Sequence, residues 1–411
     1  MSWSVRPLRE IADFALGKML DQAKNKGELL PYLANINVRW GEFDMNDLRE
    51  MRFESSELER FSLKYGDIVM CEGGEPGRCA LWKMQQSGMM FQKALHRIRP
   101  NDCLDSRFLY YSFLNLRKTN GFEPYFTGAT IKHLPREQLA KVVVRFPDIK
   151  TQEAIASVLE NYDDLIITNQ RRIQLLEDAA RRLYREWFVH QRFPGHELVA
   201  VKEGVPEGWA ILTLNDVCEA IGGGTPSTAR PEYWGGDVVW VTPTDVTRND
   251  CLVMLDSEKK ITETGLTNSS SKLVPAETIL MTSRASIGFF ALMDQPVCTN
   301  QGFISIIPRH DNTRMFLLFN LMERVEEMIA LATGATFKEL SKRTFRALPV
   351  LWPTSELLNE FESKVYPLIQ QTRLIKKQSE QLKRARDLLL PKLMSGQLDV
   401  SGTPLPEELA A

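Results

Sequence analysis

Apolar residues recur at alternating steps of four and three along two long stretches of the chain, which begin at Ile155 and Phe361. This spacing is typical of the apolar seam of a coiled coil. We therefore predict two long helices, over residues 151–192 and 354–398, that pair through their seams. At 1.5 Å per residue, each helix would be on the order of 50 Å long.

The two seams are copies of each other at an offset of 206 residues, from Ile155 to Phe361. Polar residues such as Asn169 and Arg386 interrupt the seams and could fix their register at some cost in stability. A single amphipathic helix on a globular surface would rarely keep such a seam over this length, so we favour pairing. The apolar seam positions are Ile155, Leu159, Tyr162, Ile166, Ile173, Leu176, Leu183, Phe361, Val365, Leu368, Ile375, Leu382 and Leu389.

The same offset relates segments outside the predicted helices. Thr127-Gly128-Ala129-Thr130 returns as Thr333-Gly334-Ala335-Thr336, and Phe146-Pro147 returns as Trp352-Pro353. Each copy thus leads through an aromatic-proline break into one of the long helices. Internal repetition on this scale decides the architecture, and it predicts a globular unit followed by a long helix, twice in tandem.

Short apolar runs between turn residues predict that each globular unit is a mixed α/β (α+β) domain. The first domain is expected over residues 1–150 and the second over 199–353. If the long helices pair antiparallel, the two domains are related by a pseudo-two-fold axis. The loops between the shared segments differ strongly, which suggests two different ligands of one kind. We expect a short helix at 8–14 and strands at 31–38, 67–70, 95–98, 142–146, 238–241, 278–281 and 303–307.

Composition narrows the class of protein. The 411 residues are 43% hydrophobic and 25% charged, as in ordinary soluble proteins. No run approaches the roughly 20 apolar residues of a membrane span, and the first residues hold no apolar signal segment, so we expect a cytoplasmic protein. The formal net charge of −2 excludes a chain that is basic overall, but arginines and lysines gather on both predicted helices.

Motifs for catalysis and metal binding are missing from the sequence. There is no phosphate-binding GxxxxGK[ST] loop, no HExxH zinc motif and no GxSxG nucleophile turn. The glycine-rich segment 222–226 runs into a proline rather than a helix, which favours a surface loop over a nucleotide cradle. The six cysteines are scattered without metal-ligand spacing, so neither a metal site nor a disulfide framework is predicted.

The order and spacing of these features resemble the specificity subunit of a type I restriction–modification system. The resemblance covers essentially the whole chain. It is carried by the two TGAT segments, each before an aromatic-proline break and a long helix. Further matching segments are Gly208-Trp209, Gly223-Gly224-Thr225-Pro226-Ser227, Thr282-Ser283-Arg284-Ala285 and the closing run from Leu389 to Leu398.

The resemblance implies two target-recognition domains, each reading one half of a bipartite double-stranded DNA target. The two helices would pack antiparallel as a spacer and dock two modification (methyltransferase) subunits. The chain itself would not be catalytic and would hold no cofactor. S-adenosylmethionine, ATP and Mg would belong to the modification and restriction (translocase/nuclease) subunits of the complex.

Polar and basic loop residues are the candidates for contacts with base edges and phosphates. Trp40 and Trp234 belong to the same loops, but half-buried packing is the favoured reading for both. The candidates in the first domain are Asn35, Asn37, Arg39, Gln92, Lys93, Thr130 and Lys132. Those in the second are Thr225, Ser227, Tyr233, Thr244, Ser283, Arg284, Asn300, Gln301, Thr336 and Lys338.

Two other classes of function compete with a DNA reader. One is a coiled-coil scaffold or adaptor that presents two protein-binding heads, which the near-neutral net charge allows. The other is a self-contained methyltransferase or nuclease, which the missing motifs oppose. Binding of duplex DNA would separate a reader from a scaffold.

Overall fold

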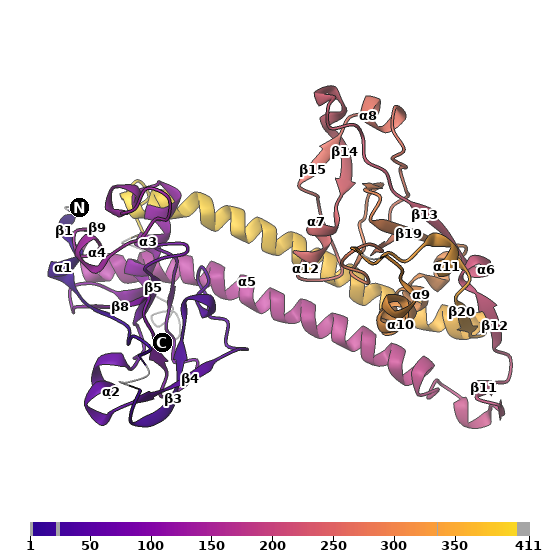
Figure 1. Cartoon of the computed structure of the whole chain (residues 1–411), viewed down its shortest axis with the longest axis horizontal. Coiled ribbons are helices and arrows are strands. Elements are labelled where there is room, and N and C mark those ends of the chain that lie inside the picture. Colours follow the sequence, from indigo (N-terminus) through magenta and orange to yellow (C-terminus); the bar gives the residue numbers. More distant parts are fainter. Residues whose placement is uncertain (1–2, 22–24, 335, 401–411) are drawn as a thin grey trace. The chain divides into compact units, whose positions relative to one another are not determined.

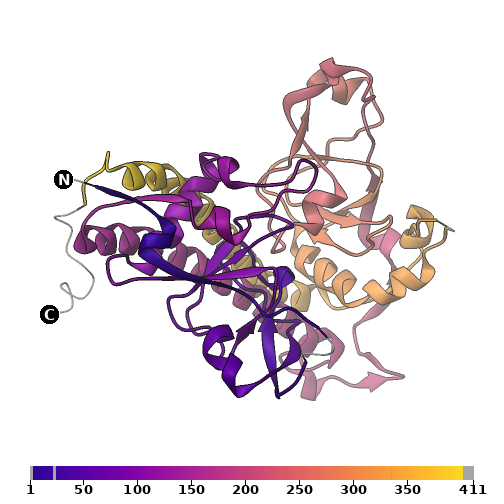
Figure 2. The same cartoon turned by 60° about the vertical axis from the view of Figure 1, so that its left-hand side comes forward.

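The computed structural model describes residues 3–21, 25–334 and 336–400. The chain divides into two compact units: unit 1 comprises Met1–Leu165 and Leu382–Ala411, and unit 2 comprises Ile166–Gln381. Two long helices, α5 (Ile149–Tyr184) and α12 (Ser355–Ser395), each contribute one part to either unit. Within each unit the two helical parts lie side by side (Figures 1 and 2).

The globular part of unit 1 is built on three small sheets, with strand orders β2-β8-β5-β6, β4-β3-β7 and β1-β9. Its strands are β1 (Ser4–Pro7), β2 (Ala12–Leu16), β3 (Glu28–Leu33), β4 (Arg49–Phe53), β5 (Ile68–Cys71), β6 (Cys79–Leu81), β7 (Met90–Phe91), β8 (Leu95–Pro100) and β9 (Val143–Phe146). Its helices before α5 are α1 (Leu8–Ile11), η2 (Asn35–Asn37), α2 (Ser55–Phe61), α3 (Ser106–Lys118), η3 (Glu123–Tyr125) and α4 (Arg136–Leu139).

Unit 2 repeats this plan with sheets β13-β19-β16-β17, β15-β14-β18 and β12-β20, and adds the hairpin β10-β11. Its strands are β10 (Val201–Lys202), β11 (Val205–Pro206), β12 (Ala210–Thr213), β13 (Cys218–Gly222), β14 (Trp234–Val241), β15 (Lys259–Ile261), β16 (Ile279–Thr282), β17 (Phe290–Ala291), β18 (Cys298–Thr299), β19 (Phe303–Pro308) and β20 (Pro349–Trp352). Its shorter helices are η4 (Arg185–Val189), η5 (His196–Leu198), α6 (Leu214–Val217), η6 (Pro231–Tyr233), α7 (Pro243–Thr247), α8 (Glu263–Thr267), η7 (Asp311–Thr313), α9 (Arg314–Glu323), α10 (Val325–Leu331) and α11 (Lys342–Arg346).

The first and last strands of each globular part pair with each other. In unit 1, β1 is antiparallel to β9, with Ser4 opposite Phe146. In unit 2, β12 is antiparallel to β20, with Ala210 opposite Trp352. Both pairs keep the 206-residue offset, and each is followed directly by a long helix.

Two predicted elements of the first domain differ from the structure. The helix expected at 8–14 ends at Ile11, and the chain continues as β2. The strand expected at 31–38 ends at Leu33 and gives way to the 3-10 turn η2. The turn forms because Asn37 Oδ1 accepts the amide of Ala34 at 2.9 Å, and short polar side chains of this kind compete with strand ladders for backbone groups.

Hydrophobic cores lie between the sheets and the long helices in each unit. In unit 1, Ile155 and Leu159 of α5 pack with Leu390 and Leu393 of α12 and with the aromatic residues of α3. In unit 2, α5 and α12 share one core with α9 and the sheet around β19. Among the described residues, no helix combines the length and apolar character needed to cross a membrane.

Candidate functional site

The two units present the same backbone frame at the end of their short parallel strand pair. In unit 1, β7 runs parallel to β3, and the amide of Gln92 donates to the carbonyl of Leu33 at 3.0 Å. In unit 2, β18 runs parallel to β14, and the amide of Asn300 donates to the carbonyl of Val241 at 3.0 Å. Gln92 and Asn300, both predicted contacts, therefore occupy the same place in the two units.

A tight turn forms the second part of the frame, at residues 71–77 in unit 1 and 282–288 in unit 2. In each turn the amide of the last residue donates to the carbonyl of the first at 3.0 Å. This hydrogen bond places Gly73 of unit 1 where unit 2 has Arg284. The match does not appear in the sequence, because the two copies stand 211 residues apart at this point instead of 206.

The TGAT segments form the third part, as closed loops at residues 127–133 and 333–339. In both loops the first and last residues exchange two backbone hydrogen bonds of 2.8–3.1 Å. The residue after each loop then donates its amide to the tight turn: Leu134 to Glu72 at 2.7 Å and Leu340 to Ser283 at 2.9 Å. Each TGAT loop is thus fastened beside the turn. Ala335 lies outside the described residues.

In unit 2, predicted contacts gather around one open depression of about 360 Å³, lined by Pro243, Arg284, Asn300, Gln301 and Phe337 among others. The side chain of Arg284 is 47% exposed and lies 3.8 Å from the carboxylate of Glu339. The hydroxyl of Thr225 donates to the side-chain carbonyl of Gln301. Thr336 and Lys338 flank Phe337 and are exposed. An open surface with one guanidinium and two amides suits a polar ligand.

In unit 1, the same frame carries different side chains. Asn35 holds the position of Pro243, and its Nδ2 donates to the carbonyl of Gly73 at 3.0 Å. No donor among the described residues reaches Asn35 Oδ1, which is buried. Lys93 is exposed next to Gln92. The frame of unit 1 therefore offers the amide of Gln92 and a lysine where unit 2 offers an arginine and two amides.

The other exposed candidates of unit 1 are basic or hydroxyl side chains on neighbouring loops. Lys132 and Thr130 belong to the TGAT loop, and the ammonium of Lys132 pairs with Glu123 at 2.6 Å. Arg39 lies 3.6 Å from Asp44 in the loop after η2. Because both ion pairs are solvent-exposed, Lys132 and Arg39 can exchange their carboxylate partners for another anion at little cost in free energy.

Three predicted contacts have buried side chains. Asn37 is 2% exposed, and its Nδ2 donates to the carbonyls of Asp44 and Asp47. Ser283, also 2% exposed, holds the tight turn through its backbone. Tyr233 packs under the guanidinium of Arg230, 5.6 Å from the ring centre. Sequence alone did not separate such loop-supporting residues from exposed ones.

Two more predicted contacts of the second domain are exposed, and one residue that was not predicted supports a loop beside them. Thr244 is exposed in α7, and Ser227 is exposed and accepts the indole N–H of Trp234 through its carbonyl at 3.2 Å. Asp245, which sequence reasoning missed, accepts the amide of Thr242 at 2.8 Å. It closes the loop after β14 as Asn37 closes the loop after β3. Trp234 itself packs edge-on against Trp240, with ring centres 5.0 Å apart.

The long helices contact each other in opposite directions within each unit. In unit 1, Asp163 of α5 pairs with Arg386 of α12, and Ile155 lines one pocket with Ser395. In unit 2, Asn169 Nδ2 donates to Gln378 Oε1 at 3.4 Å, and the rings of Tyr184 and Phe361 lie 6.1 Å apart. Later residues of α5 meet earlier residues of α12 in both units. Every predicted seam side chain is buried or half-buried.

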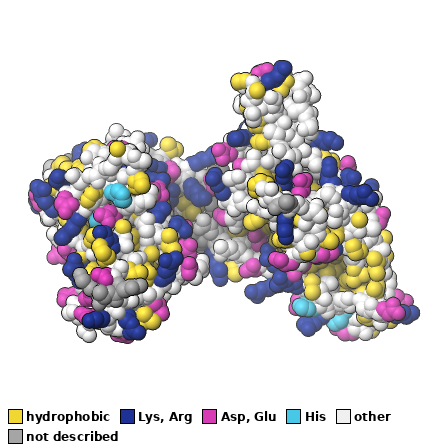
Figure 3. Space-filling view, viewed as in Figure 1, with side chains coloured by type: hydrophobic (Ala, Val, Ile, Leu, Met, Phe, Trp, Pro, Cys, Tyr) yellow, Lys and Arg dark blue, Asp and Glu magenta, His cyan; other side chains and the backbone are white. Residues whose placement is uncertain are grey.

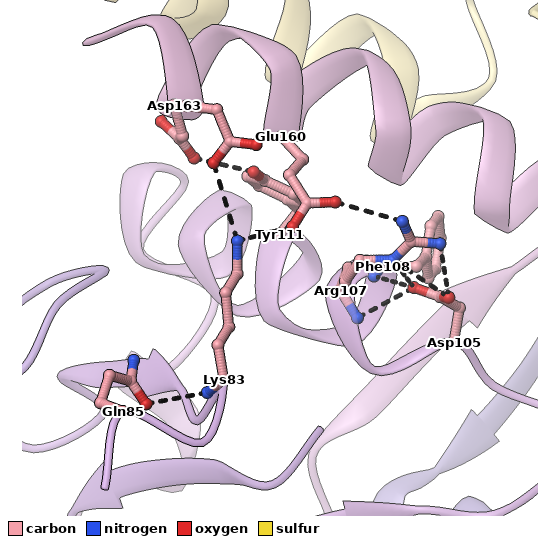
Figure 4. Close-up of polar contacts among 9 residues, drawn as sticks. Lys83, Gln85, Asp105, Arg107, Phe108, Tyr111, Glu160 and Asp163 are labelled. Carbon is pink, nitrogen blue, oxygen red and sulfur yellow. Dashed lines mark hydrogen bonds and ion pairs between the residues drawn. The ribbon is translucent and has the colours of Figure 1, made fainter. Parts of the chain in front are cut away.

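Ion pairs attach the globular part of unit 1 to the helices (Figure 4). Glu160 of α5 accepts from Lys83 at 2.6 Å and from Arg107 at 3.1 Å. The hydroxyl of Tyr111 donates to Asp163 at 2.7 Å. Burial alone would raise the pKa of Glu160, but the two cations outweigh burial and hold that pKa below its ordinary value.

Buried carboxyl groups and aromatic rings attach the globular part of unit 2. Glu177 of α5 accepts the amide of Leu252 at 2.6 Å, and Glu362 of α12 accepts the amide of Met315 at 2.8 Å. Burial raises the pKa of both glutamates to about 7. Next to Glu362, Phe361 packs with the rings of Tyr184 in α5 and of Trp187 and Phe188 in η4, and its ring centre lies 4.9 Å from that of Phe188.

The basic residues of the helices divide into two groups. Arg171, Arg172 and Arg384 are exposed, whereas Lys376 donates to Asn249 and Asp250 and Lys377 pairs with Asp294 at 2.6 Å. Figure 3 shows Lys and Arg side chains interspersed with Asp and Glu over the visible face of both units. The low net charge therefore reflects mixed surfaces.

The described part of the chain contains no cluster of His, Cys, Asp and Glu that could hold a metal ion. Its cysteines are free thiols, and Cys71, Cys79, Cys218 and Cys298 are buried. Burial raises the pKa of the Cys71 and Cys298 thiols to about 11, so these groups are packed neutral thiols rather than reactive thiolates.

Comparison with known proteins gives consistent matches over both units. The family described as Type I restriction modification DNA specificity domain matches residues 2–178 and 206–384. The MjaIX specificity subunit of Methanocaldococcus jannaschii is 36% identical over 154 residues, which cover 37% of this chain and 36% of that relative. The HindI specificity subunit of Haemophilus influenzae is 24% identical over 66% of this chain and 72% of its own length.

A solved structure matches nearly the whole fold. The S subunit of a type I restriction–modification system from M. genitalium superposes with a TM-score of 0.60 at 18% sequence identity, and the match covers 95% of this chain and 96% of that one. At this identity the likeness concerns the fold alone. It agrees with the two similar mixed α/β units that the sequence repeat predicts.

Proposed function

The chain belongs to the family of type I restriction–modification DNA specificity proteins, and from this premise we propose that each globular domain reads one half of a bipartite duplex DNA target. The supporting observation is that one backbone frame carries different side chains in the two units, Gly73 in one and Arg284 in the other. Amide side chains pair with the edge of adenine and arginine with that of guanine in the major groove. Two unlike half-sites follow from two unlike sets of side chains.

The exposed candidates divide by chemistry. We assign base contacts to Gln92, Arg284, Asn300 and Gln301, because amides and guanidinium groups discriminate between base edges; the amide of Asn35 is engaged by the tight turn and supports the loop instead. The remaining basic side chains and the hydroxyls suit phosphate and sugar contacts, which position the protein without reading sequence. This second set comprises Arg39, Lys93, Thr130, Lys132, Thr225, Ser227, Thr244, Thr336 and Lys338, while Asn37, Tyr233 and Ser283 support the loops from within.

The long helices would act as a spacer between the two half-sites. The opposed contacts of α5 and α12 in each unit, together with the buried seam, support an antiparallel coiled coil with a pseudo-two-fold axis. Half-sites read from one face of duplex DNA lie about one turn apart, ~34–36 Å. The helices, on the order of 50 Å or longer, are long enough to set such a gap.

Partner subunits would supply the chemistry. We propose two modification (methyltransferase) subunits that dock on the exposed helix faces, where Arg171, Arg172 and Leu175 of α5 and Arg384 and Leu388 of α12 are exposed. S-adenosylmethionine, ATP and Mg would be bound by the modification and restriction subunits in the cytoplasm. The chain would contribute recognition and no catalytic residue.

Mapping of methylated adenines in cells that express the chain with its partner subunits tests this function. We expect one two-part sequence, absent from cells without the chain. Replacing residues 199–353 with the equivalent region of a relative should change one half of that sequence and leave the other half and the gap intact. A coiled-coil scaffold that binds proteins would give no methylated sequence and no binding to duplex DNA. Simultaneous change of both halves would contradict separate readers.

A further inference from the structure

Each TGAT loop holds one large apolar side chain out in solvent. Ile131 is 66% exposed and Phe337 is 59% exposed. They occupy the same loop position, 206 residues apart, between the Thr-Gly-Ala-Thr segment and the lysine that both loops share. Leaving such a side chain in water forgoes the favourable free energy of burying it, so its recurrence at both loop tips indicates a partner that covers it.

The backbone of each loop keeps this side chain at the tip. Gly128 has a φ of +93° and Gly334 a φ of +132°, a region that favours glycine. A Cβ on either glycine would lie 2.2 Å from the carbonyl oxygen of residue 131 or 337. The backbone of the apolar residue therefore approaches the glycine so closely that no side chain would fit there. The first and last residues of the loop close it with paired backbone hydrogen bonds. Such a preorganised loop loses little conformational freedom on binding.

The surroundings of the exposed side chain favour nucleic acid over an apolar protein groove. Phe337 lines the same depression as Arg284, Asn300 and Gln301, and Lys338 follows it. Ile131 is followed by Lys132 in the same way. An apolar group between a lysine and hydrogen-bonding side chains matches the apolar base faces, polar base edges and phosphates of DNA.

We propose that Phe337 and Ile131 are apolar wedges that insert at a base step, or stack on an exposed base face, within their own half-sites. The inference rests on the proposed function and adds to it a local distortion of the DNA. Apolar side chains used in this way partly unstack the step and kink the duplex, and a stacked aromatic residue contributes sequence-tolerant affinity. Phe337 should therefore contribute more than Ile131.

Binding of the full complex to a duplex that carries the mapped methylation sequence tests the wedge. Phe337→Ala should weaken binding roughly 10- to 100-fold, and Ile131→Ala roughly 3- to 10-fold, by analogy with loss of a base-stacking residue. Phe337→Trp should retain tight binding. With 2-aminopurine in place of adenines in the half-site, the wild-type complex should raise the fluorescence of one position by unstacking it, and Phe337→Ala should abolish that rise.

Matched controls are Ile211→Ala and Val5→Ala, because these side chains are 68% and 61% exposed and lie on β12 and β1, away from the TGAT loops. Neither should change affinity or fluorescence. If wild-type complex fails to bind the duplex, the proposed function itself is wrong. If it binds, and Phe337→Ala binds equally well with the same fluorescence, the function stands and the wedge is wrong.

Discussion

The two globular parts share one frame, and apolar packing and ion pairs attach both of them to the long helices, but the glutamates at the two junctions have different partners. Unit 1 uses hydrogen-bonded ion pairs centred on Glu160 of α5. Unit 2 uses the buried carboxyl groups of Glu177 and Glu362 and an aromatic cluster around Phe361. The recognition frame therefore does not dictate how a domain is held. A similar fold tolerates either a glutamate bound by two cations or a glutamate bound by a backbone amide at this junction, provided that buried polar groups find partners.

This difference predicts opposite responses to acid. A carboxyl group whose pKa is lowered by folding stabilises the fold above its unfolded pKa and loses that contribution as pH falls. A carboxyl group whose pKa is raised makes the folded state bind more protons than the unfolded state, so stability declines as pH rises between the two values. Glu160 should lose its contribution to the stability of unit 1 in acid, whereas Glu177 and Glu362 should destabilise unit 2 as the pH rises from 4.5 to about 7.

The largest expected effect comes from removing the aromatic centre of the unit 2 junction. Phe361→Ala should lower the free energy of unfolding of unit 2 by about 3–5 kcal/mol, because a fully buried ring is lost and leaves a cavity. Its repeat equivalent in unit 1, Ile155→Ala, should cost about 2–4 kcal/mol. Hydrogen exchange read by mass spectrometry should show faster exchange in unit 2 for the first variant and in unit 1 for the second. Uniform loss of protection in both units by either variant would contradict separate junctions.

A smaller effect is expected from Glu177→Gln. Glutamine can still accept the Leu252 amide but carries no charge, so the variant should stabilise unit 2 by roughly 1–3 kcal/mol at pH 8 and by little at pH 5. The expected window follows from a pKa of about 7 in the folded state against 4.5 for an ordinary glutamate. Urea unfolding between pH 5 and 8 measures it, and an unchanged pH slope would oppose a buried, titrating carboxyl at this position.

The smallest effect is expected from Glu160→Gln in unit 1. Loss of the charge removes the attraction of Lys83 and Arg107, and should cost roughly 1 kcal/mol at pH 7. The cost should shrink in high salt and should fade as the pH falls below 4.5, the ordinary pKa of a glutamate, towards the lower pKa of Glu160 in the folded state. Asp164→Asn is the control, because Asp164 lies 3.8 Å from Lys83 with a side chain that is 58% exposed. Equal effects of the two variants would mean that Glu160 is no more important than a surface charge.

Strong periodicity and exact repetition explain what the sequence predicts well. The helices expected at 151–192 and 354–398 occur at 149–184 and 355–395. The first predicted helix extends beyond the end of α5 because Trp187 and Phe188 continue the apolar pattern. Both residues belong to the π-helical segment η4 and are buried in the aromatic cluster. Apolar spacing indicates which side chains are buried, and buried positions can continue along the chain beyond the end of an α-helix.

The recognition frame was harder to predict, for two physical reasons. The offset between the copies drifts from 206 to 208 at Gln92 and Asn300 and to 211 at the tight turn, so equivalence appears only in backbone hydrogen bonds. In addition, a short polar side chain can form hydrogen bonds either within its own loop or with a ligand, and the sequence does not distinguish the two. Asn35 and Asn37 are two residues apart, yet only Asn37 uses both its amide oxygen and its amide nitrogen in hydrogen bonds within its own loop.

The pairing of first and last strands in each globular part has a consequence for evolution. Ser4 lies opposite Phe146 and Ala210 lies opposite Trp352. Each globular part, here called a head, therefore begins and ends at almost the same point in space. Insertions and deletions inside a head are then absorbed before the helix begins, as the return of the offset to 206 shows. Such a head behaves as a cassette, in which loops can be rewritten by mutation or exchanged by recombination without shifting the phase of the helix that follows.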